Sequence, residues 1–255
     1  MGKLIGLDKV VMDADVFAIC VQHALSIEKQ EIMGVLMGEV DETECTSRIK
    51  AVRILNRSDK HADRVEISPN QLVLAVDTAE QLEDTFGKPL KVLGWYHSHP
   101  HITVDPSGID VNTQAGYQVM SIYFIGLIFS VFNIDSATKK NKIHLTCFQA
   151  SGHLRKDVEL VIQSVPLRLH TLREIAGLPD ILVREEEETC ESNAEQDELA
   201  ILHNDTLKTI KLVQIVSNLT RRISDDLEER STTVSQRIKI LEKMKRELQN
   251  DLQSL

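Results

Sequence analysis

Two histidines, a serine and an aspartate stand close together in one short stretch of the chain. The stretch reads HSHPHITVDPSGID, with His97 and His99 one residue apart, ten residues between His99 and Asp110, and Ser107 three positions before that aspartate. Imidazole nitrogens and carboxylate oxygens are zinc ligands, and three of them with a fourth position left to water is the pattern of a catalytic zinc site. The stretch therefore predicts a metal centre.

The flanking residues predict how these side chains are brought together. Val92–Tyr96 is apolar and aromatic enough to be a buried strand. Residues i and i+2 of a strand point to the same face, so His97 and His99 should converge. Ser107 has the features of a helix N-cap, which puts Asp110 in the first turn of the helix. A strand end that meets a helix start can offer two imidazoles and a carboxylate to one ion.

Each feature also has an ordinary structural explanation. A single histidine near a strand end is commonly a satisfied core or surface residue. Ser-x-x-Asp before an apolar residue is a capping box that needs no metal, and the prolines at positions 100 and 106 can mark a loop and nothing more. The combination of these features in this order and spacing is far rarer by chance than any single feature. The combination therefore favours a metal site.

The joint pattern resembles the motif of the JAMM (MPN-plus) metalloprotease family. That motif is H-x-H, ten residues and D, with a serine three before the aspartate; His97, His99, Ser107 and Asp110 match it. The family also has an upstream glutamate, matched here by Glu31 in EIMGVLMG, which is similar to the family's E-x-x-G-x-L-x-G strand. The resemblance covers roughly the first two thirds of the chain.

The resemblance implies an α/β MPN domain, with a mixed sheet flanked by helices, and an isopeptidase reaction at one zinc ion per chain. His97, His99 and Asp110 would hold the zinc, which lowers the pKa of a water and polarises the scissile carbonyl. Glu31 would be the general base, and Ser107 would stabilise the oxyanion. The last two roles come from the family alone, because spacing establishes at most the three metal ligands.

Within the family, GWYHSHPHITVDPS and the helical tail resemble the lysine-63-specific deubiquitinase subunits of BRISC and BRCA-type complexes. This implies lysine-63-linked polyubiquitin as substrate, a function in DNA repair, and activation by a catalytically dead MPN partner of Abraxas or Abro type, in a dimer of heterodimers with further subunits. Cytoplasmic and nuclear locations are both expected. The polar segment Asn56–Glu66 is either a solvated loop or a contact for the distal ubiquitin, and Asp105 adds a carboxylate beside the site.

Amino-acid composition and charge limit the classes of protein and of partner that fit this chain. The chain has 255 residues, 42% of them hydrophobic and 27% charged, with a net charge of −10; this is ordinary for a soluble domain with an appendage. The acidic balance, with no basic stripe, argues against nucleic acid and anionic membranes as partners. The most apolar run, Val119–Ile134, is interrupted by polar residues and is shorter than the roughly 20 residues of a membrane helix. Four cysteines with no CxxC pair are expected to be free thiols in a reducing compartment.

Hydrophobic periodicity predicts alternating strands and helices up to Pro166. Besides the strand that carries the histidines, strands are expected at Lys9–Met12, Glu31–Val40, Ser47–Leu55, Tyr123–Asn133, Ile143–Ala150 and Val158–Ser164, and helices at Asp13–Ser26, Ser68–Gly87 and Ser107–Met120.

The composition changes beyond Pro166. Leu169–Ala176 is helical, and the acidic run at Arg184–Glu188 is typical of a solvated loop or linker. From Leu199 onward apolar residues recur every three or four positions, with an interruption at Ser231–Thr233, which indicates a helical hairpin or coiled coil. We expect a catalytic domain at 1–166, a connecting helix and acidic linker at 167–198, and helices for partner assembly at 199–255. Packing of the apolar stripes on the chain's own sheet is the alternative.

Two rival functions belong to other classes. A non-catalytic MPN scaffold is the first, but family scaffolds typically lose a histidine, the serine or the glutamate, and all are present here. A zinc nucleobase deaminase is the second; it would need H-x-E and P-C-x-x-C, and neither occurs.

Overall fold

The computed structural model describes residues 7–56, 67–135, 139, 141–191, 198–215, 217 and 221–253. The chain divides into two compact units, Met1–Ile181 and Leu182–Leu255. The first unit contains a β-sheet with its helices, and the second is helical.

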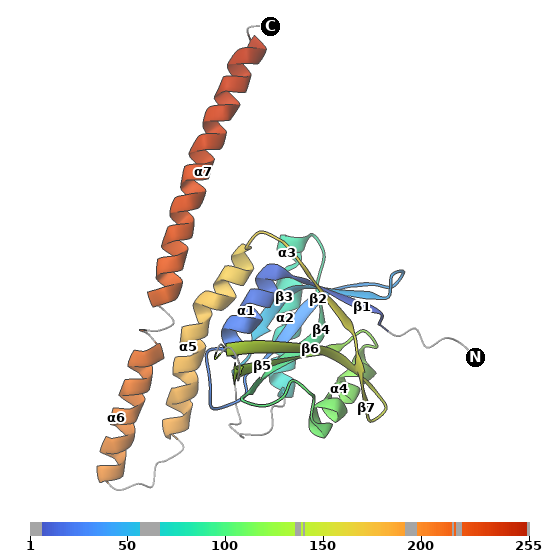
Figure 1. Cartoon of the computed structure of the whole chain (residues 1–255), viewed down its shortest axis with the longest axis vertical. Helices are drawn as coiled ribbons and strands as arrows, with labels where there is room; N and C mark the ends of the chain where they lie inside the picture. Colours follow the sequence, from blue (N-terminus) through green and yellow to red (C-terminus); the bar gives the residue numbers. More distant parts are fainter. Residues whose placement is uncertain are drawn as a thin grey trace, which may run out of the picture. The chain divides into compact units, whose positions relative to one another are not determined.

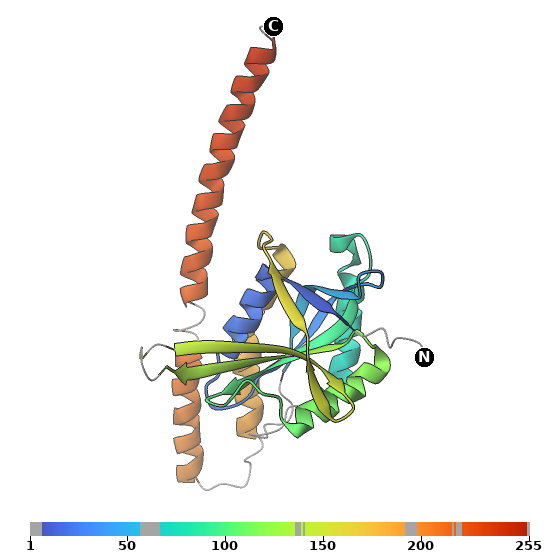
Figure 2. The ribbon, with the colours of Figure 1, turned by 45° about the vertical axis from the view of Figure 1, so that its right-hand side comes forward.

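A mixed sheet of eight strands organises the first unit (Figure 1, Figure 2). The strands are β1 Lys9–Asp13, β2 Met33–Asp41, β3 Thr46–Ile54, β4 Lys91–Pro100, β5 Ile125–Ile134, β6 Asn141–Ser151, β7 Leu154–Asp157 and β8 Glu159–Gln163. Their spatial order is β7-β6-β5-β4-β2-β3-β1-β8. The pairs β4–β5, β1–β3 and β1–β8 are parallel, and the others are antiparallel. The α/β class with a mixed sheet is thereby confirmed.

Helices cover both faces of this sheet. α2 (Pro69–Gln81) and α4 (Gly108–Met120) pack on the face where Trp95 contributes to the core, and the short α3 (Glu83–Phe86) follows α2. α1 (Ala14–Ala24) packs on the other face, because Tyr96, the next residue of β4, bonds to His23 of α1. Successive strand residues point to opposite faces. Trp95 and Tyr96 are both fully buried, as expected for core residues.

Most predicted strands and helices of this unit are confirmed to within a few residues. Ser68 forms the predicted N-cap of α2, in a full capping box. Gly87 ends α3 with a φ of 73°, a conformation in which glycine is the favoured residue. β2 begins two residues later than predicted, so Glu31 precedes the strand, and β7 was not predicted. Of the loop proposed to contact the distal ubiquitin, residues 57–66 lie outside the described part of the chain.

The acidic run after residue 183 is helical, so its interpretation as a loop is wrong, whereas its interpretation as a linker stays a prediction. α5 extends from Leu169 to Glu191 and includes Pro179 and the run Arg184–Glu188. Glutamate and arginine have high intrinsic helix propensity, and this outweighs both the local charge density and the one backbone hydrogen bond that a proline cannot make.

The second unit contains α6 (Glu198–Ile215) and α7 (Arg221–Gln253). α7 runs through Ser231–Thr233, where the sequence predicted an interruption. The hydroxyls of Thr232 and Thr233 donate to carbonyl oxygens four residues earlier, so their polar groups are satisfied inside the helix. None of the helices in the described part of the chain combines the length and the apolar character needed to cross a bilayer.

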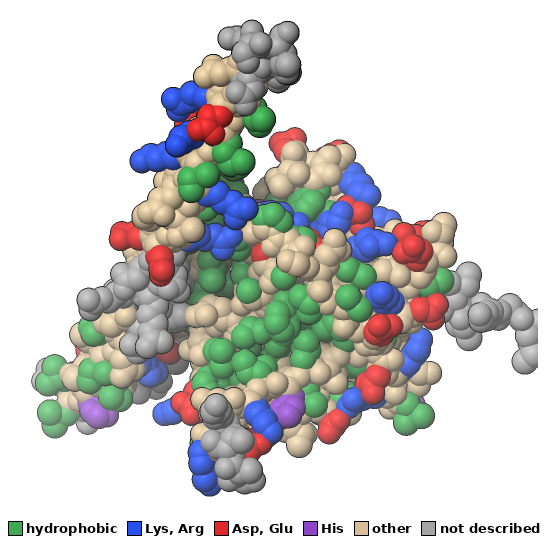
Figure 3. All heavy atoms as spheres, turned by 45° about the horizontal axis from the view of Figure 1, so that its top comes forward, with side chains coloured by type: hydrophobic (Ala, Val, Ile, Leu, Met, Phe, Trp, Pro, Cys, Tyr) green, Lys and Arg blue, Asp and Glu red, His purple; other side chains and the backbone are tan. Residues whose placement is uncertain are grey.

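Charged side chains of both signs are interspersed on the face of the molecule drawn in Figure 3. Hydrophobic side chains gather in one area of the same face. Among the described residues drawn there, the mixture of charges produces no continuous basic stripe of the kind that nucleic-acid-binding proteins use.

Candidate metal centre

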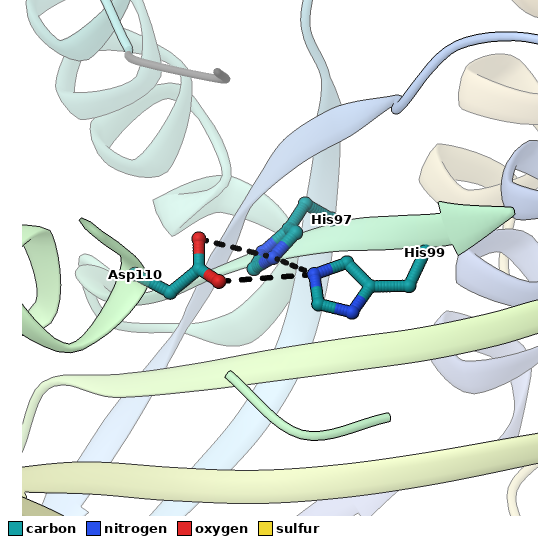
Figure 4. A group of neighbouring side chains, drawn as sticks. All are labelled: His97, His99 and Asp110. Atoms are coloured by element: carbon teal, nitrogen blue, oxygen red, sulfur yellow. Dashed lines mark hydrogen bonds and ion pairs between the residues drawn. The ribbon is translucent and has the colours of Figure 1, made fainter. Parts of the chain in front are cut away.

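The end of β4 and the first turn of α4 bring two histidines and an aspartate together (Figure 4). Nε2 of His97 is 3.1 Å from Nε2 of His99 and 3.4 Å from Oδ1 of Asp110. Nε2 of His99 is 3.7 Å from Oδ2 of the same carboxylate. One ligand atom from each residue lies within 4.8 Å of the other two. A single ion could therefore contact all three residues.

The local structure explains this convergence. His97 and His99 are alternate residues of β4 and share a face. Asp110 is the third residue of α4, in a capping box with Ser107: the Ser107 amide donates to Oδ2 of Asp110 at 2.7 Å, and Oγ of Ser107 accepts from the Asp110 amide at 3.2 Å. Both sequence explanations thus hold together, because the carboxylate that caps the helix also faces the imidazoles.

Burial and the mutual contacts set the protonation of the three groups. Burial lowers the pKa of the fully enclosed His97 imidazole, although Asp110 opposes this. Burial also acts to lower the pKa of His99, but its bonds to Asp110 and to the Thr103 carbonyl raise that pKa overall. Burial acts to raise the pKa of Asp110, yet the two imidazoles hold it far below its usual range. Asp110 is therefore an anion at neutral pH, the state that binds a metal.

The donor set fits a divalent metal ion. Nδ1 of His99 lies 2.7 Å from the Thr103 carbonyl oxygen and donates its proton there, so in the neutral imidazole, the form that binds a metal, the Nε2 lone pair points at His97 and Asp110. Two imidazole nitrogens and a carboxylate then meet at a point where there are too few protons to pair them. A cation satisfies all three. Nδ1 of His97 is buried and has no hydrogen-bond partner among the described residues.

Trp95 and Gln114 support the site from behind. The Trp95 ring stacks on the His97 imidazole, with centroids 4.6 Å apart and planes inclined by 21°. Its Nε1 donates to Oε1 of Gln114 at 2.9 Å, and Nε2 of Gln114 donates to the Phe124 carbonyl at 2.8 Å. Gln114 is fully buried and lies one turn after Asp110 on α4. Its hydrogen bond to Trp95 therefore joins α4 to β4. Sequence reasoning missed Gln114; its signal was a polar residue four positions after a ligand, on the buried helix face.

The structure also brings Glu31 to the metal centre. Its Oε1 is 3.9 Å from Nε2 of His99, and its side chain is mostly buried. Glu31 is distant from the histidines in sequence, but β2, which follows it, pairs with β4 and places Met33 opposite His97. Ser107 is exposed at the start of α4, where its hydroxyl proton can be donated to a group at the site.

Two further polar residues near the site, His101 and Asp105, have partners elsewhere. Nε2 of His101 lies 3.1 Å from Oε1 of Glu28, and both side chains are exposed. Asp105 forms an ion pair with Arg155 of β7, which also pairs with Asp157. Asp105 is therefore a contact between the loop that precedes α4 and the β7 strand.

Comparison with known proteins covers the sheet and the C-terminal helices. Residues 6–121 match the family described as JAB1/Mov34/MPN/PAD-1 ubiquitin protease, and residues 171–248 match the BRCC36 C-terminal helical domain. The protein named Lys-63-specific deubiquitinase BRCC36 in Camponotus floridanus is 43% identical over 246 residues, which cover 95% of this chain and 96% of that protein. The protein of the same name in Xenopus tropicalis is 42% identical over 257 residues, with 96% and 98% covered. The similarity thus extends over almost the full length of both relatives.

Proposed function

Because this chain belongs to the JAB1/Mov34/MPN/PAD-1 ubiquitin protease family, and within it resembles the BRCC36 deubiquitinases over nearly its whole length, we propose that it hydrolyses lysine-63-linked ubiquitin chains. One observation supports this most directly. The two histidines, Asp110 and Glu31 meet at one buried site, with Ser107 at its edge. A scaffold without catalytic activity has no need of this complete set.

His97, His99 and Asp110 would hold one zinc ion, which when bound supplies Lewis acidity toward the scissile carbonyl and acidifies a water. Glu31 is close enough to act on a water at this point: its carboxylate takes the proton and later delivers it to the lysine amine that leaves. The carboxylate is thereby regenerated in each turnover. Ser107 donates a hydrogen bond to the carbonyl oxygen as that oxygen becomes an anion.

The exposed apolar stripe on α7 supports a function within a complex. Its members are Val234, Ile238, Leu241, Met244 and Leu248, each 48–61% exposed. They recur at the three- and four-residue steps of a coiled coil, and so long an exposed stripe marks an association surface. We infer that it pairs with a catalytically dead MPN partner of Abraxas or Abro type and that two such pairs assemble with further subunits. We also infer that the protein is located in both the cytoplasm and the nucleus and that it has a function in DNA repair.

The proposed function is tested with a panel of diubiquitins of different linkage. The purified chain is assayed alone and with its MPN partner, each beside Glu31→Gln and a zinc chelator. We expect cleavage of the lysine-63 linkage only, with partner only, and its loss in both controls. No cleavage under any condition, despite one zinc per chain, would favour the scaffold function.

The assembly is tested separately on α7. Leu241→Glu puts a charge into the stripe, whereas Lys239→Glu changes a charge on the opposite side of the same helix. We expect the first variant to lose partner binding and partner-dependent activity and the second to keep both. Equal binding by the two variants would contradict a partner on this stripe.

A further inference from the structure

We propose that Ser98, the residue between the two histidines, is a positioning residue that holds the general base Glu31 at the metal centre. The inference rests on the proposed function, since it assigns a supporting group to that reaction. It concerns a side chain that faces away from the metal ligands, because residue 98 alternates with residues 97 and 99 along β4.

A reciprocal pair of hydrogen bonds carries the inference. The Ser98 amide donates to the Ile32 carbonyl oxygen at 3.0 Å. The Ile32 amide donates to Oγ of Ser98, also at 3.0 Å. Both bonds therefore join the immediate neighbour of Glu31 to the residue that separates the two histidines.

The position of these bonds explains their importance. The regular pairing of β2 with β4 starts at Met33 opposite His97. Glu31 precedes β2, so the ladder itself does not include it. The bonds between Ser98 and Ile32 extend the attachment one residue further, up to the residue that follows Glu31. They set where the Glu31 carboxylate meets the site.

Burial makes the serine hydroxyl hard to replace. Ser98 is fully buried, and Ile32 is 1% exposed. If Oγ is removed, the Ile32 amide loses its acceptor in a region without solvent, and the chain must shift to satisfy it. A misplacement of about 1 Å in a catalytic group can lower a rate about 100-fold, and a general base contributes about 100- to 10,000-fold.

The test compares Ser98→Ala with a matched serine. Ser47 is also fully buried in a strand, and its Oγ donates to the Tyr123 carbonyl oxygen, but it lies on β3, a strand that carries no residue of the site. In the complex with partner, we expect Ser98→Ala to lower kcat about 10- to 100-fold, with KM changed less than about twofold and zinc content unchanged. Ser98→Cys, which keeps the size with a weaker acceptor, should give a smaller loss, and Ser47→Ala should retain wild-type kcat.

A double-mutant cycle distinguishes positioning of the base from general damage. If Ser98 acts through Glu31, Ser98→Ala should add almost nothing to the loss caused by Glu31→Gln. Fully additive losses, an unchanged kcat in Ser98→Ala, or loss of zinc from that variant would each overturn the inference.

A readout without catalysis separates this inference from the proposed function. Amide exchange at Ile32 should accelerate in Ser98→Ala by about tenfold or more, as expected for a lost buried bond of about 1.4 kcal/mol, and should not change in Ser47→Ala. If the wild-type complex cleaves no ubiquitin, the proposed function is wrong. The exchange measurement then still tests whether the Ser98 hydroxyl holds the Ile32 backbone in place. Unchanged exchange at Ile32 in Ser98→Ala would overturn the inference whatever the activity.

Discussion

Replacing Gly34 with alanine tests how tightly β2 is packed against β4, the strand that carries the two histidines. Gly34 lies opposite Tyr96 in the β2–β4 ladder. A Cβ added at Gly34 would lie 2.3 Å from Cε1 and 2.6 Å from the hydroxyl oxygen of Tyr96. Since non-bonded carbon atoms pack about 3.5–4.0 Å apart, the ring would have to move by more than about 1 Å.

Tyr96 is held in place from several directions. It is fully buried, its hydroxyl lies 2.9 Å from Nδ1 of His23, and its ring packs edge-on against Phe129. Overpacking costs about 1–3 kcal/mol, and a weakened buried hydrogen bond adds about 1 kcal/mol. We therefore expect Gly34→Ala to lower the free energy of unfolding by about 2–4 kcal/mol. In a chain of this size that lowers Tm by about 5–15 °C.

Thermal and denaturant unfolding of the variants check this value. Gly116→Ala is the matched control: nothing lies within 4 Å of the added methyl, and the glycine is inside α4. That variant should be as stable as the wild type or up to about 1 kcal/mol more stable. In a Tyr96→Ala background the clash is absent, so Gly34→Ala should cost little. An equal cost in both backgrounds, or a wild-type Tm for Gly34→Ala, would refute the steric explanation.

Three more substitutions give expected outcomes at other contacts. Asp110→Asn should lower zinc affinity at least about tenfold, because a neutral amide replaces the carboxylate, and metal analysis after dialysis measures this. Asp105→Asn removes the exposed pair with Arg155, so cleavage should fall only about two- to fivefold, and its dependence on salt, followed kinetically, should weaken. Asp15→Asn removes one of the two buried carboxylates that pair with the Arg168 guanidinium, the other being Asp13, and should cost about 1–3 kcal/mol in urea unfolding. Burial acts to raise the Asp15 pKa, but the bonds to Arg168 lower it overall. The Asp15 carboxylate therefore stabilises the wild-type fold fully above its unfolded-state pKa, and this stabilisation is lost as the pH falls through the lower folded-state pKa. The variant should lack this part of the pH dependence of stability.

Local sequence rules were enough to predict that His97, His99 and Asp110 come together at a site that could hold a metal ion. His97 and His99 share a face because a strand has a period of two, and Asp110 follows an N-cap serine whose chemistry is recognisable in sequence. These rules act over a few residues, so they do not depend on the rest of the fold. α5 shows the limit of such reasoning. The charge density of its acidic run suggested a loop, but the helix propensity of the same residues extends α5 to Glu191.

Which groups from distant parts of the chain lie beside these three residues depends on the tertiary structure. Glu31 was assigned from family resemblance, and it reaches the site because β2 pairs with β4, which also joins Ile32 to Ser98 across 66 residues of sequence. The bond between Gln114 and Trp95 likewise depends on how α4 packs on the sheet. Pairing between strands and packing of helices are settled by burial over the whole domain, where many registers are locally acceptable and one encloses the core. That global choice placed Glu31 and Gln114 near the three residues that local spacing had already grouped.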